Sequence, residues 1–412
     1  MRTIVLGAGV VGVCAAYFLH RAGHEVTVVE RRDAAGDGTS WGNGALLHPC
    51  SIQPWAAPGT LRKLLRWMGQ EDAPMLLRPR AIPRILPWGL SFLRNCSVSR
   101  MEATTLHNLA LALETREAMA AIREETGIAY DYVASRAIMP WSTIALRDED
   151  AAAHGFMTAG GLKIEKLDRA QVEALDPAFS AIPESKLAGA VHFPQTDIGD
   201  CPSFAKGLAA WLAARGVTFR YGTTALGVEL ASGRVAGVRV PDGVLPADNV
   251  VMALASDSKG LLAPLGVRLN VLPVKGVSFT FPREAWPDAP RWAVMDHERN
   301  YALTPVGDRI RLVGSAEIGF VEEGPTPTRL DAVLRRAAEL FPAVTEAVRH
   351  PATVRWSGFR PVMPDGRPVI GPTRIPGLWL DTGHGHMGWT LGAGSGRRLA
   401  EQIGGANMAR AA

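Results

Sequence analysis

Three glycines near the N-terminus have the spacing of a nucleotide-binding turn. Gly7, Gly9 and Gly12 form a G-x-G-x-x-G pattern directly after a short apolar stretch, and Glu30 follows 18 residues beyond Gly12. The first glycine permits a tight turn, the second lets the backbone approach a pyrophosphate, and the third allows a helix to pack closely on a strand. An acidic side chain at this distance can accept hydrogen bonds from the ribose of an adenosine. The pattern therefore predicts dinucleotide binding.

Two arginines follow the acidic residue and bear on the kind of dinucleotide. Arg31 and Arg32 could indicate a 2′-phosphate, but the carboxylate of Glu30 would repel that phosphate. We therefore expect both arginines to be solvated or to face the diphosphate. The motif alone does not separate FAD from NAD.

A second glycine-rich junction favours a flavin. Residues 383–389 read Gly-His-Gly-His-Met-Gly-Trp ahead of a helical pattern, and residues 39–44 read Thr-Ser-Trp-Gly-Asn-Gly. A helix N-terminus carries partial positive charge, so it would stabilise negative charge on the pyrimidine edge of a reduced flavin. A flavin is long and needs backbone from distant parts of the chain, whereas a nicotinamide dehydrogenase does not need this second junction. The combination favours FAD.

The elements that must position the N-terminal motif read as α/β structure. A helical pattern at 10–22 between strand patterns at 3–6 and 25–29 predicts a βαβ unit. The Gly- and Pro-rich region that follows, 36–87, has one helical patch at 61–68. Loops of this length inside a compact domain are usually functional.

The rest of the chain alternates helical and strand patterns. Residues 101–126 predict a long helix, and the C-terminus predicts a strand at 378–381, a glycine-rich turn over 383–396 and a helix at 397–403. Shorter elements are expected at 137–141, 148–158, 168–175, 202–215, 217–221, 235–240, 249–254 and 330–340.

The composition and net charge of the chain do not indicate a macromolecular partner. Of the 412 residues, 47% are hydrophobic and 20% charged, and the formal charge is +4, so nucleic acid is not expected. Cys14, Cys50, Cys96 and Cys201 have no C-x-x-C spacing, which argues against disulfides and a metal site and fits a cytoplasmic setting. The uncharged stretch 3–19 is short for a bilayer span and is interrupted by glycines. We expect a soluble protein, at most peripheral on the inner face of the cytoplasmic membrane.

Several further segments resemble a known family. Together with the N-terminal motif they are similar to bacterial D-amino acid dehydrogenases of the small-subunit type, within the wider family of glycine oxidase, sarcosine oxidase and D-amino acid oxidase. The likeness runs along nearly the whole chain and is most specific at its two ends. It rests on residues 54–59, 358–361, 364–371, 382–385, 388–390 and 394–396.

The resemblance implies a fold and a domain organisation. The fold would be α/β, with a Rossmann-like FAD-binding domain and a discontinuous second α+β substrate domain, as in flavoproteins of the glutathione-reductase type. The expected FAD-binding domain comprises residues 1–95, 190–265 and 346–412, and the expected substrate-binding domain comprises residues 96–189 and 266–345.

The resemblance also implies how FAD would be held. The cofactor would be non-covalent, because no cysteine lies near the C-terminal glycine-rich junction. Relatives more often have glycine at position 255, so the methyl group of Ala255 would narrow the adenosine side of the site. The expected cofactor-binding residues are Gly7, Gly9, Val10, Val11, Gly12, Glu30, Arg31, Thr39, Ser40, Asn43, Gly44, Ala225, Ala255, Gly358, Arg360, Gly383, His384, Gly385, His386, Met387, Gly388 and Trp389.

Three residues are expected to act on the substrate. Arg360 is the candidate for the α-carboxylate, because a guanidinium can form a bidentate, charge-assisted pair. His48 would line the pocket above the flavin, with a packed loop histidine as the alternative. Tyr301 would reach the carboxylate, with a tyrosine that covers an apolar core as the alternative. Lys275 and Gly276 match a family Lys-Gly step, which a solvated turn explains equally well.

The expected reaction is oxidative deamination of a small D-amino acid by hydride transfer to flavin N5. Cyclic substrates such as D-proline and 4-hydroxy-D-proline are included, the product would be the imino or 2-oxo acid, and a quinone or respiratory component would accept the electrons. Orientation of the α-hydrogen would supply most of the catalysis, so no catalytic base is expected. Two alternatives stay open: an oxygen-using amine or amino acid oxidase for glycine or sarcosine, and a non-catalytic flavin subunit that relays electrons. The sequence leaves the oligomeric state open.

Overall fold

The N-terminal βαβ unit extends into a sheet of short apolar strands buried on both faces. The computed structural model describes residues 1–319 and 322–411. In it this sheet has six strands, and all of them except one edge strand run parallel. Ile4 points to one face and Val5 to the other, so a continuous apolar run is what such a strand requires. The strand order is β19 (Val369–Pro372), β20 (Leu378–Thr382), β13 (Asn249–Met252), β1 (Arg2–Leu6), β2 (Glu25–Val29) and β9 (Thr218–Arg220).

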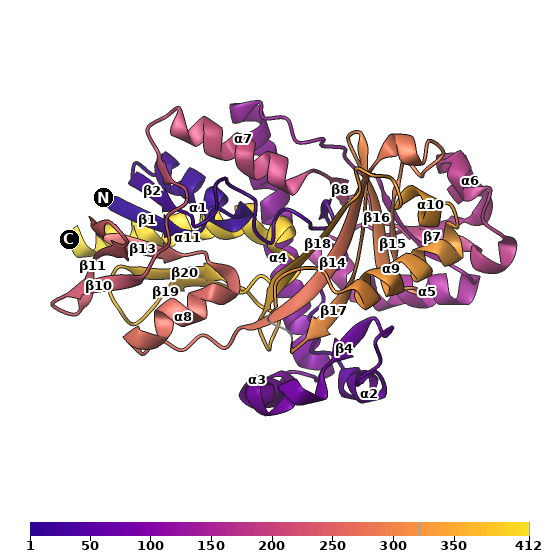
Figure 1. Ribbon diagram of the computed structural model, residues 1–412, viewed down its shortest axis with the longest axis horizontal. Helices are drawn as coiled ribbons and strands as arrows, with labels where there is room; N and C mark the ends of the chain where they lie inside the picture. The colour runs from indigo at the N-terminus through magenta and orange to yellow at the C-terminus, as the bar shows by residue number, and fades with distance from the viewer. Residues whose placement is uncertain (320–321, 412) are drawn as a thin grey trace.

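Different layers cover the two faces of this sheet (Figure 1). Helices cover one face and share a core cluster with it: α1 (Val10–Arg21), α7 (Cys201–Ala213), α11 (Gly388–Ala411) and α4 (Val98–Thr126). The other face packs on α8 (Ser258–Leu262) and on a three-stranded sheet of β10 (Gly227–Ala231), β11 (Arg234–Val240) and β12 (Gly243–Pro246).

The second large sheet has nine strands and is mostly antiparallel. Its order is β18 (Val354–Val362), β14 (Leu272–Pro282), β17 (Arg309–Ile318), β16 (Tyr301–Val306), β15 (Ala293–Asp296), β5 (Ala137–Trp141), β7 (Gly189–His192) and β6 (Glu165–Asp168), with β4 (Met75–Leu77) beside β17. A small sheet pairs β3 (Leu46–Leu47) with β8 (Asp197–Ile198). The outer helices are α2 (Thr60–Arg66), α3 (Ile82–Arg94), α5 (Ile144–Ala153), α6 (Arg169–Leu175), α9 (Pro327–Leu340) and α10 (Val344–Ala347).

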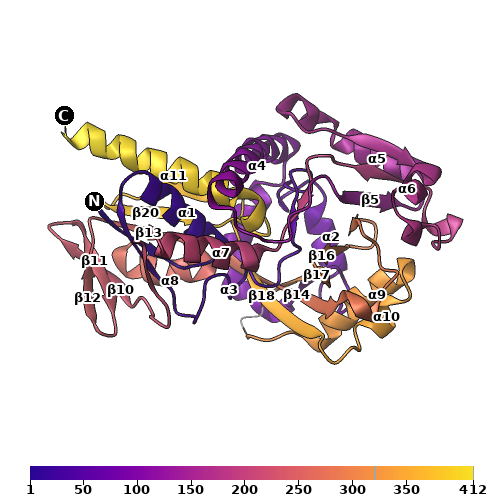
Figure 2. The same ribbon diagram turned by 90° about the horizontal axis from the view of Figure 1, so that it is seen from above.

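The mixed α/β class expected from the sequence is confirmed, but the C-terminal helix begins earlier than predicted. The expected glycine-rich turn over 383–396 ends at Met387, and α11 already starts at Gly388. The glycines inside α11 allow close helix packing: a Cβ on Gly396 would lie 2.8 Å from the backbone nitrogen of Ala15 in α1. Figure 2 shows α11 running beside α4 and α1. These glycines therefore serve packing of the helix layer and form no turn.

Two more elements differ from the sequence-based expectation. Residues expected to be loop form α3, which continues through Pro87, and β18 was not anticipated although it lines the site described below. The described residues, 1–319 and 322–411, include no helix that is both long enough and apolar enough to span a bilayer.

Candidate active site

A large cavity lies between the six-stranded sheet and the nine-stranded sheet. Its volume is about 1460 Å³, whereas small-ligand sites usually measure about 300–1,000 Å³. Its walls come from the turn after β1, the segment 38–44, the turn after β13, strand β18 and the turn before α11. The cavity therefore has room for a dinucleotide together with a small substrate.

The cavity wall contains nearly all of the residues predicted from the sequence to bind cofactor or substrate. Two predicted cofactor residues are not part of it. Gly12 lies beneath the turn, where a Cβ would be 1.9 Å from the carbonyl oxygen of Gly7, so it serves helix–strand packing. Met387 is buried in a core cluster with Leu46 and Leu391.

The glycine turn after β1 has the geometry that a phosphate site needs. Gly7 has φ +101°, and a Cβ there would lie 2.7 Å from the carbonyl oxygen of Ala253. The helix α1 starts at Val10, whose amide donates to Ser40 Oγ at 3.1 Å. The N-cap residue Gly9 itself contributes no side-chain hydrogen bond to the amides of the first turn. The positive end of α1 therefore faces the cavity and suits an anionic group.

Glu30 lines the cavity beside the glycine turn, and two backbone amides orient its carboxylate. Oε2 accepts from the amide of Ala8 at 2.7 Å, and Oε1 accepts from the amide of Arg32 at 2.9 Å. Arg31 points outward and pairs with Asp257 at 2.9 Å, with both side chains more than half exposed. Of these two residues, Glu30 is therefore the one whose charge is held beside the glycine turn.

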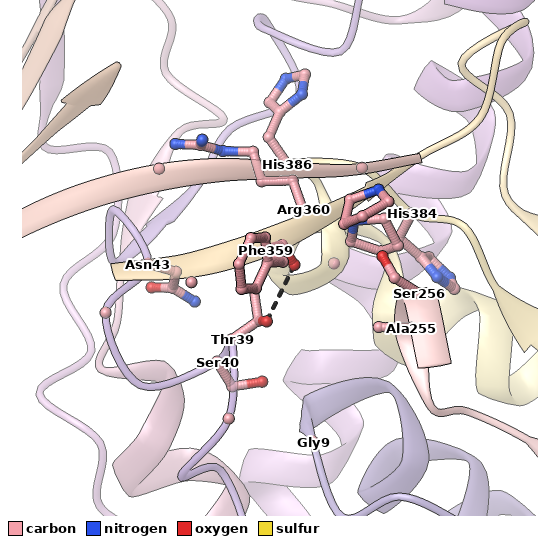
Figure 3. Close-up of a pocket in the computed structure, with 18 of the residues that line it drawn as sticks. Gly9, Thr39, Ser40, Asn43, Ala255, Ser256, Phe359, Arg360, His384 and His386 are labelled. Carbon is pink, nitrogen blue, oxygen red and sulfur yellow. Dashed lines mark hydrogen bonds between the residues drawn. The ribbon is translucent and has the colours of Figure 1, made fainter. Parts of the chain in front are cut away.

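The segment 39–44 ties the cavity to strand β18 and to β16. Thr39 Oγ1 donates to the carbonyl oxygen of Phe359 at 3.1 Å, a bond drawn in Figure 3. The Asn43 side chain accepts from the amide of Ala45, and the carbonyl oxygen of Gly44 accepts from Thr304 Oγ1 at 2.8 Å. The segment is therefore held on both sides, although it has no regular structure of its own.

The turn before α11 forms the opposite wall. Gly383 and Gly385 both have positive φ, and the amide of Gly385 donates to the carbonyl oxygen of Pro361. His384 points inward and its Nε2 lies 3.0 Å from Ser395 Oγ; burial lowers the pKa of His384 to about 3. Trp389 adds its edge to the wall and donates from Nε1 to Gly199. This turn brings a second helix N-terminus to the cavity.

Smaller residues complete the cofactor side of the wall. Ala225 and Gly358 both line the cavity. A Cβ on Gly358 would lie 2.1 Å from the ring of Trp356, so a larger residue would not fit there. Ala255 has φ +52°, a conformation that favours glycine. A glycine at this position would relieve the backbone strain.

Arg360 presents a partly buried positive charge to the cavity. On β18 it pairs with Val274 of β14, and its Nη1 donates to the carbonyl oxygen of Ser315 at 3.0 Å. The guanidinium lies against Gly276, where a Cβ would be 2.1 Å from Nη1. Burial lowers the pKa of Arg360 to about 10. In the described part of the chain, Arg360 forms no salt bridge with a carboxylate, so its guanidinium could pair with a carboxylate that enters the cavity.

An aromatic stack lies beside this arginine. The ring of His386 stacks on Trp55 at 5.6 Å and on His48 at 6.2 Å between centroids, each at 10° between planes. In Figure 3, His386 and Arg360 extend to the same side of the β18 ribbon, at the end of the view opposite Gly9. The cavity thus has one end at the glycine turn and the N-terminus of α1, and another end at Arg360 and the aromatic stack.

The imidazole of His386 has a fixed proton arrangement. Its Nε2 lies 3.1 Å from the carbonyl oxygen of Ser51, and a carbonyl can only accept, so Nε2 carries the hydrogen and Nδ1 the lone pair. Burial lowers the pKa of His386 to about 4, the bond to Ser51 opposes this, and the charge of Arg360 adds to it. Burial, with smaller contributions from His386 and His297, lowers the pKa of His48 to about 3.

Tyr301 is placed differently from its predicted role. Its ring belongs to the core cluster beneath α9, with Leu303 and Val333, and its hydroxyl lies beside Asp296. Its strand neighbour Ala302 packs against the cluster on the other face of the sheet. The side chain therefore follows the alternative reading, a tyrosine that covers an apolar core, while its backbone lines the cavity.

Sequence reasoning missed or undervalued several residues in the cavity wall or directly behind it. Lys275 is buried in β14 and donates to the carbonyl oxygen of Gly324, so the solvated-turn alternative is wrong. Gly276, Ser315 and His297 had no assigned role, yet the first two position Arg360. The signal that was available is Gly276 itself, because an interior glycine in a strand often marks a close approach.

The donor set fits FAD. Two helix N-termini point at one cavity, Glu30 is oriented at the adenosine end, and a Cβ at Gly7 or Gly12 would obstruct the turn. The volume exceeds what a substrate alone would fill. A flavoprotein of the Rossmann-like type is the class that this fold and this cavity define.

Comparisons with known proteins agree with that class. The chain belongs to the FAD dependent oxidoreductase (DAO) family, whose pattern matches residues 2–402. It is 40% identical over 406 residues to a D-amino acid dehydrogenase of Paramagnetospirillum magneticum, covering 98% of this chain and 95% of the relative. It is 41% identical over 403 residues to a D-amino acid dehydrogenase of Sinorhizobium medicae, covering 98% and 96%.

Solved structures share the fold at low sequence identity. Glycine oxidase from Bacillus cereus superimposes with a TM-score of 0.72 at 21% identity, covering 98% of this chain and 95% of the other. L-proline dehydrogenase from P. horikoshii gives a TM-score of 0.71 at 18% identity, covering 98% and 92%. These similarities support the mixed α/β flavoprotein fold.

Proposed function

We propose that the chain is an FAD-dependent D-amino acid dehydrogenase acting on small substrates, including cyclic ones such as D-proline or 4-hydroxy-D-proline. The observation that carries the proposal is the partly buried guanidinium of Arg360, which has no carboxylate partner in the described chain and faces the cavity. A partly buried cation of this kind is stabilised by a bound carboxylate. The names of relatives about 40% identical over nearly the full chain support the D-amino acid class.

Specific residues would hold the cofactor and the substrate. The turn at Gly7 and Gly9 with the N-terminus of α1 would hold the diphosphate, Glu30 the ribose, and the turn before α11 the flavin ring. When bound, FAD accepts the hydride that leaves the α-carbon during oxidation of the amine. We propose non-covalent binding.

The chain itself contributes orientation and a dry environment. Arg360 would bind the α-carboxylate and so fix the α-carbon, while the stack of Trp55, His386 and His48 would exclude water from the same end of the cavity. Because burial keeps the pKa of His386 near 4, the stack stays uncharged at neutral pH and does not compete with Arg360 for the carboxylate.

The domain division and the electron acceptor belong to the same proposal. We infer an FAD-binding domain of residues 1–95, 190–265 and 346–412 and a substrate domain of residues 96–189 and 266–345, with β18 hydrogen-bonded into the sheet of the latter. We propose a quinone or another respiratory component as the acceptor, and peripheral contact with a membrane. A small D-amino acid is the proposed partner of the cavity.

The test is anaerobic bleaching of the bound flavin by a panel of D- and L-amino acids. We expect small D-isomers to bleach it far faster than their L-isomers, since loss of near-attack geometry costs about a hundredfold or more. Equal rates for both isomers, or bleaching by N-methylglycine alone, would reject the proposed substrate class. Rapid peroxide formation in air would favour an oxidase over a dehydrogenase.

Arg360 can be tested in the same assay. Arg360→Lys keeps the charge and loses the planar fork, so kcat/KM should fall while FAD remains bound. Lys259→Arg, which changes a cation elsewhere on the cavity wall, serves as the matched control. An unchanged kcat/KM in Arg360→Lys would remove this residue from the substrate site.

A further inference from the structure

Two short helices expose an unusual number of large apolar side chains. Among the described residues, seven of the sixteen exposed large hydrophobic side chains fall within residues 61–98. They are Leu61, Leu65, Ile82, Leu86, Leu90, Leu93 and Val98, and Leu65, Leu86 and Leu90 are each at least 50% exposed. A concentration of this kind in one segment marks an interaction site.

The exposed side chains follow helical spacing, so they form one face. In α3, Ile82, Leu86 and Leu90 are four residues apart, and Leu93 falls on the same side. The opposite side of α3 carries Trp88 and is buried. The outward face is therefore apolar although the helix already has a buried apolar face.

The buried sides of α2 and α3 anchor this face to the fold. Leu64 of α2 and Trp88 and Phe92 of α3 belong to one core cluster, which includes Val274 of β14 and Val362 of β18. Trp88 Nε1 also donates to the carbonyl oxygen of Val362 at 3.1 Å. The exposed side chains of α2 and α3 are thus presented on supported helices. We use the name α2–α3 apolar face for Leu61, Leu65, Ile82, Leu86, Leu90, Leu93 and Val98.

Exposed basic residues are interspersed along the chain with the side chains of the α2–α3 apolar face. Residues 60–100 contain eight Lys and Arg against two Asp and Glu, a net charge of +6, whereas the whole chain carries +4 and the remainder therefore −2. Exposed members include Arg62, Lys63, Arg66, Arg80, Arg84 and Arg94. Exposed leucines among cations are the pattern of segments that lie on anionic lipid surfaces.

The position of this face relative to the cavity gives it a functional meaning. Figure 1 shows α2 and α3 at the lower edge of the molecule, outside both large sheets, and Figure 2 places them beneath its centre. The chain that links the two helices supplies Trp67, Pro74 and Met75 to the cavity wall. The α2–α3 apolar face therefore adjoins the end of the cavity that contains Arg360 and the aromatic stack with Trp55.

We propose that the α2–α3 apolar face docks the protein on the surface of a bilayer containing anionic lipids. Docking seats the leucines in the headgroup boundary, pairs the interspersed cations with lipid phosphates, and holds the Trp67–Met75 rim of the cavity at the membrane. This inference rests on the proposed function in one respect, since it gives a lipid-soluble electron acceptor a short route to the site. A second copy of the chain is the less favoured occupant, because two faces of charge +6 would repel each other.

The test is flotation of the full-length, FAD-loaded protein with lipid vesicles. Vesicles of phosphatidylcholine alone are compared with vesicles that also contain phosphatidylglycerol, at low and high salt. We expect binding to the anionic vesicles and weaker binding at high salt, because salt screens the cationic contribution. Leu86→Ser with Leu90→Ser should reduce the partition coefficient at least about tenfold.

Two matched controls separate this face from general surface effects. Leu226→Ser with Val244→Ser changes apolar side chains of similar exposure at the three-stranded sheet of β10, β11 and β12, and should leave binding unchanged. Arg80→Gln with Arg84→Gln should weaken binding about fivefold per cation. Arg234→Gln with Arg268→Gln, at exposed positions outside the segment, should not.

Several outcomes would overturn the inference. The first is that the wild-type protein does not bind anionic vesicles, and the second is that the Leu86/Leu90 variant binds them as strongly as the wild type does. The third is a change of oligomeric state without vesicle binding, which would assign the face to a second copy of the chain. Flavin bleaching by D-amino acids in solution does not need the membrane. Bleaching without vesicle binding therefore rejects the docking face alone, and vesicle binding without bleaching rejects the proposed function alone.

Discussion

The guanidinium of Arg360 lies against the α-carbon of Gly276 on the adjacent strand, and a Cβ at position 276 would be 2.1 Å from Nη1. The two residues are 84 positions apart in sequence. The absence of a side chain at Gly276 thus leaves the space that the guanidinium group of Arg360 occupies. The proposed carboxylate site depends on this pair of residues and not on the arginine alone.

The first prediction follows from this contact. Gly276→Ala should displace the guanidinium without changing the charge of the protein, because the far end of a flexible side chain moves more easily than the sheet. Since a hydrogen bond to a charged group contributes about 1.5–3 kcal/mol, KM for the best substrate should rise about 10- to 100-fold. Steady-state kinetics with an artificial electron acceptor measure this, and FAD content should stay unchanged. Gly89→Ala, where a Cβ meets open space, is the control.

The second prediction concerns cofactor affinity. Glu30→Gln keeps the size of the side chain but removes the charge and one of the two acceptor oxygens that bond to Ala8 and Arg32. The Kd for FAD should rise about tenfold or more, because bonds to a charged group are the stronger ones. Titration of apoprotein followed by flavin fluorescence measures the Kd. Glu25→Gln, at the exposed start of the same strand, should bind as the wild type does, and an equal Kd for Glu30→Gln would refute the assignment.

The N-terminal motif lies at the cavity as expected, whereas the ring of Tyr301 packs in a core, and one physical reason explains both placements. Gly7, Gly12 and Glu30 form their site through local geometry, because a strand, a turn and a helix follow directly in the sequence. The face on which Tyr301 lies depends on strand register, and register is set by pairing with a distant strand. A shift of one residue would have turned the ring toward the cavity.

Long-range packing also explains the misjudged C-terminus. Glycine is a poor helix former, so residues 388–396 indicated a turn. In the structure these glycines lie where α11 crosses α1 and α4, and the tertiary contacts outweigh local propensity. The pairing of β14 with β18, which joins Gly276 to Arg360, was hidden for the same reason.

The third prediction concerns acid stability. His386 and His48 have pKa values of about 4 and about 3 in the folded protein, mainly because they are buried, while an unfolded histidine titrates near ~6.5. Between these values the unfolded chain binds more protons, so stability should fall as the pH decreases from about 6.5 towards 4. The His386→Gln protein should lose less Tm over this pH range than the wild-type protein does. Tm measured by flavin fluorescence at a series of pH values tests this, with His20→Gln, outside the cavity, as the control.

The last prediction uses two glycines of the same helix. A Cβ on Gly394 would lie 2.7 Å from Thr115 Oγ1 and 2.8 Å from the carbonyl oxygen of Leu111, so Gly394→Ala must push α11 away from α4. Overpacking of this kind costs about 1–3 kcal/mol. Gly404 lies in α11 with open space around its Cβ position, and replacing a helical glycine with alanine there should stabilise the helix by up to ~1 kcal/mol.

The two substitutions are chemically identical, so their opposite signs isolate the effect of packing from that of helix propensity. Denaturant unfolding of the FAD-loaded proteins should give a lower midpoint for Gly394→Ala and an equal or higher midpoint for Gly404→Ala. The first residue of α11, Gly388, lines the cavity. Gly394→Ala should therefore also raise the Kd for FAD. A Gly394→Ala protein as stable as the wild type would mean that the glycines of α11 are not required for its contact with α4.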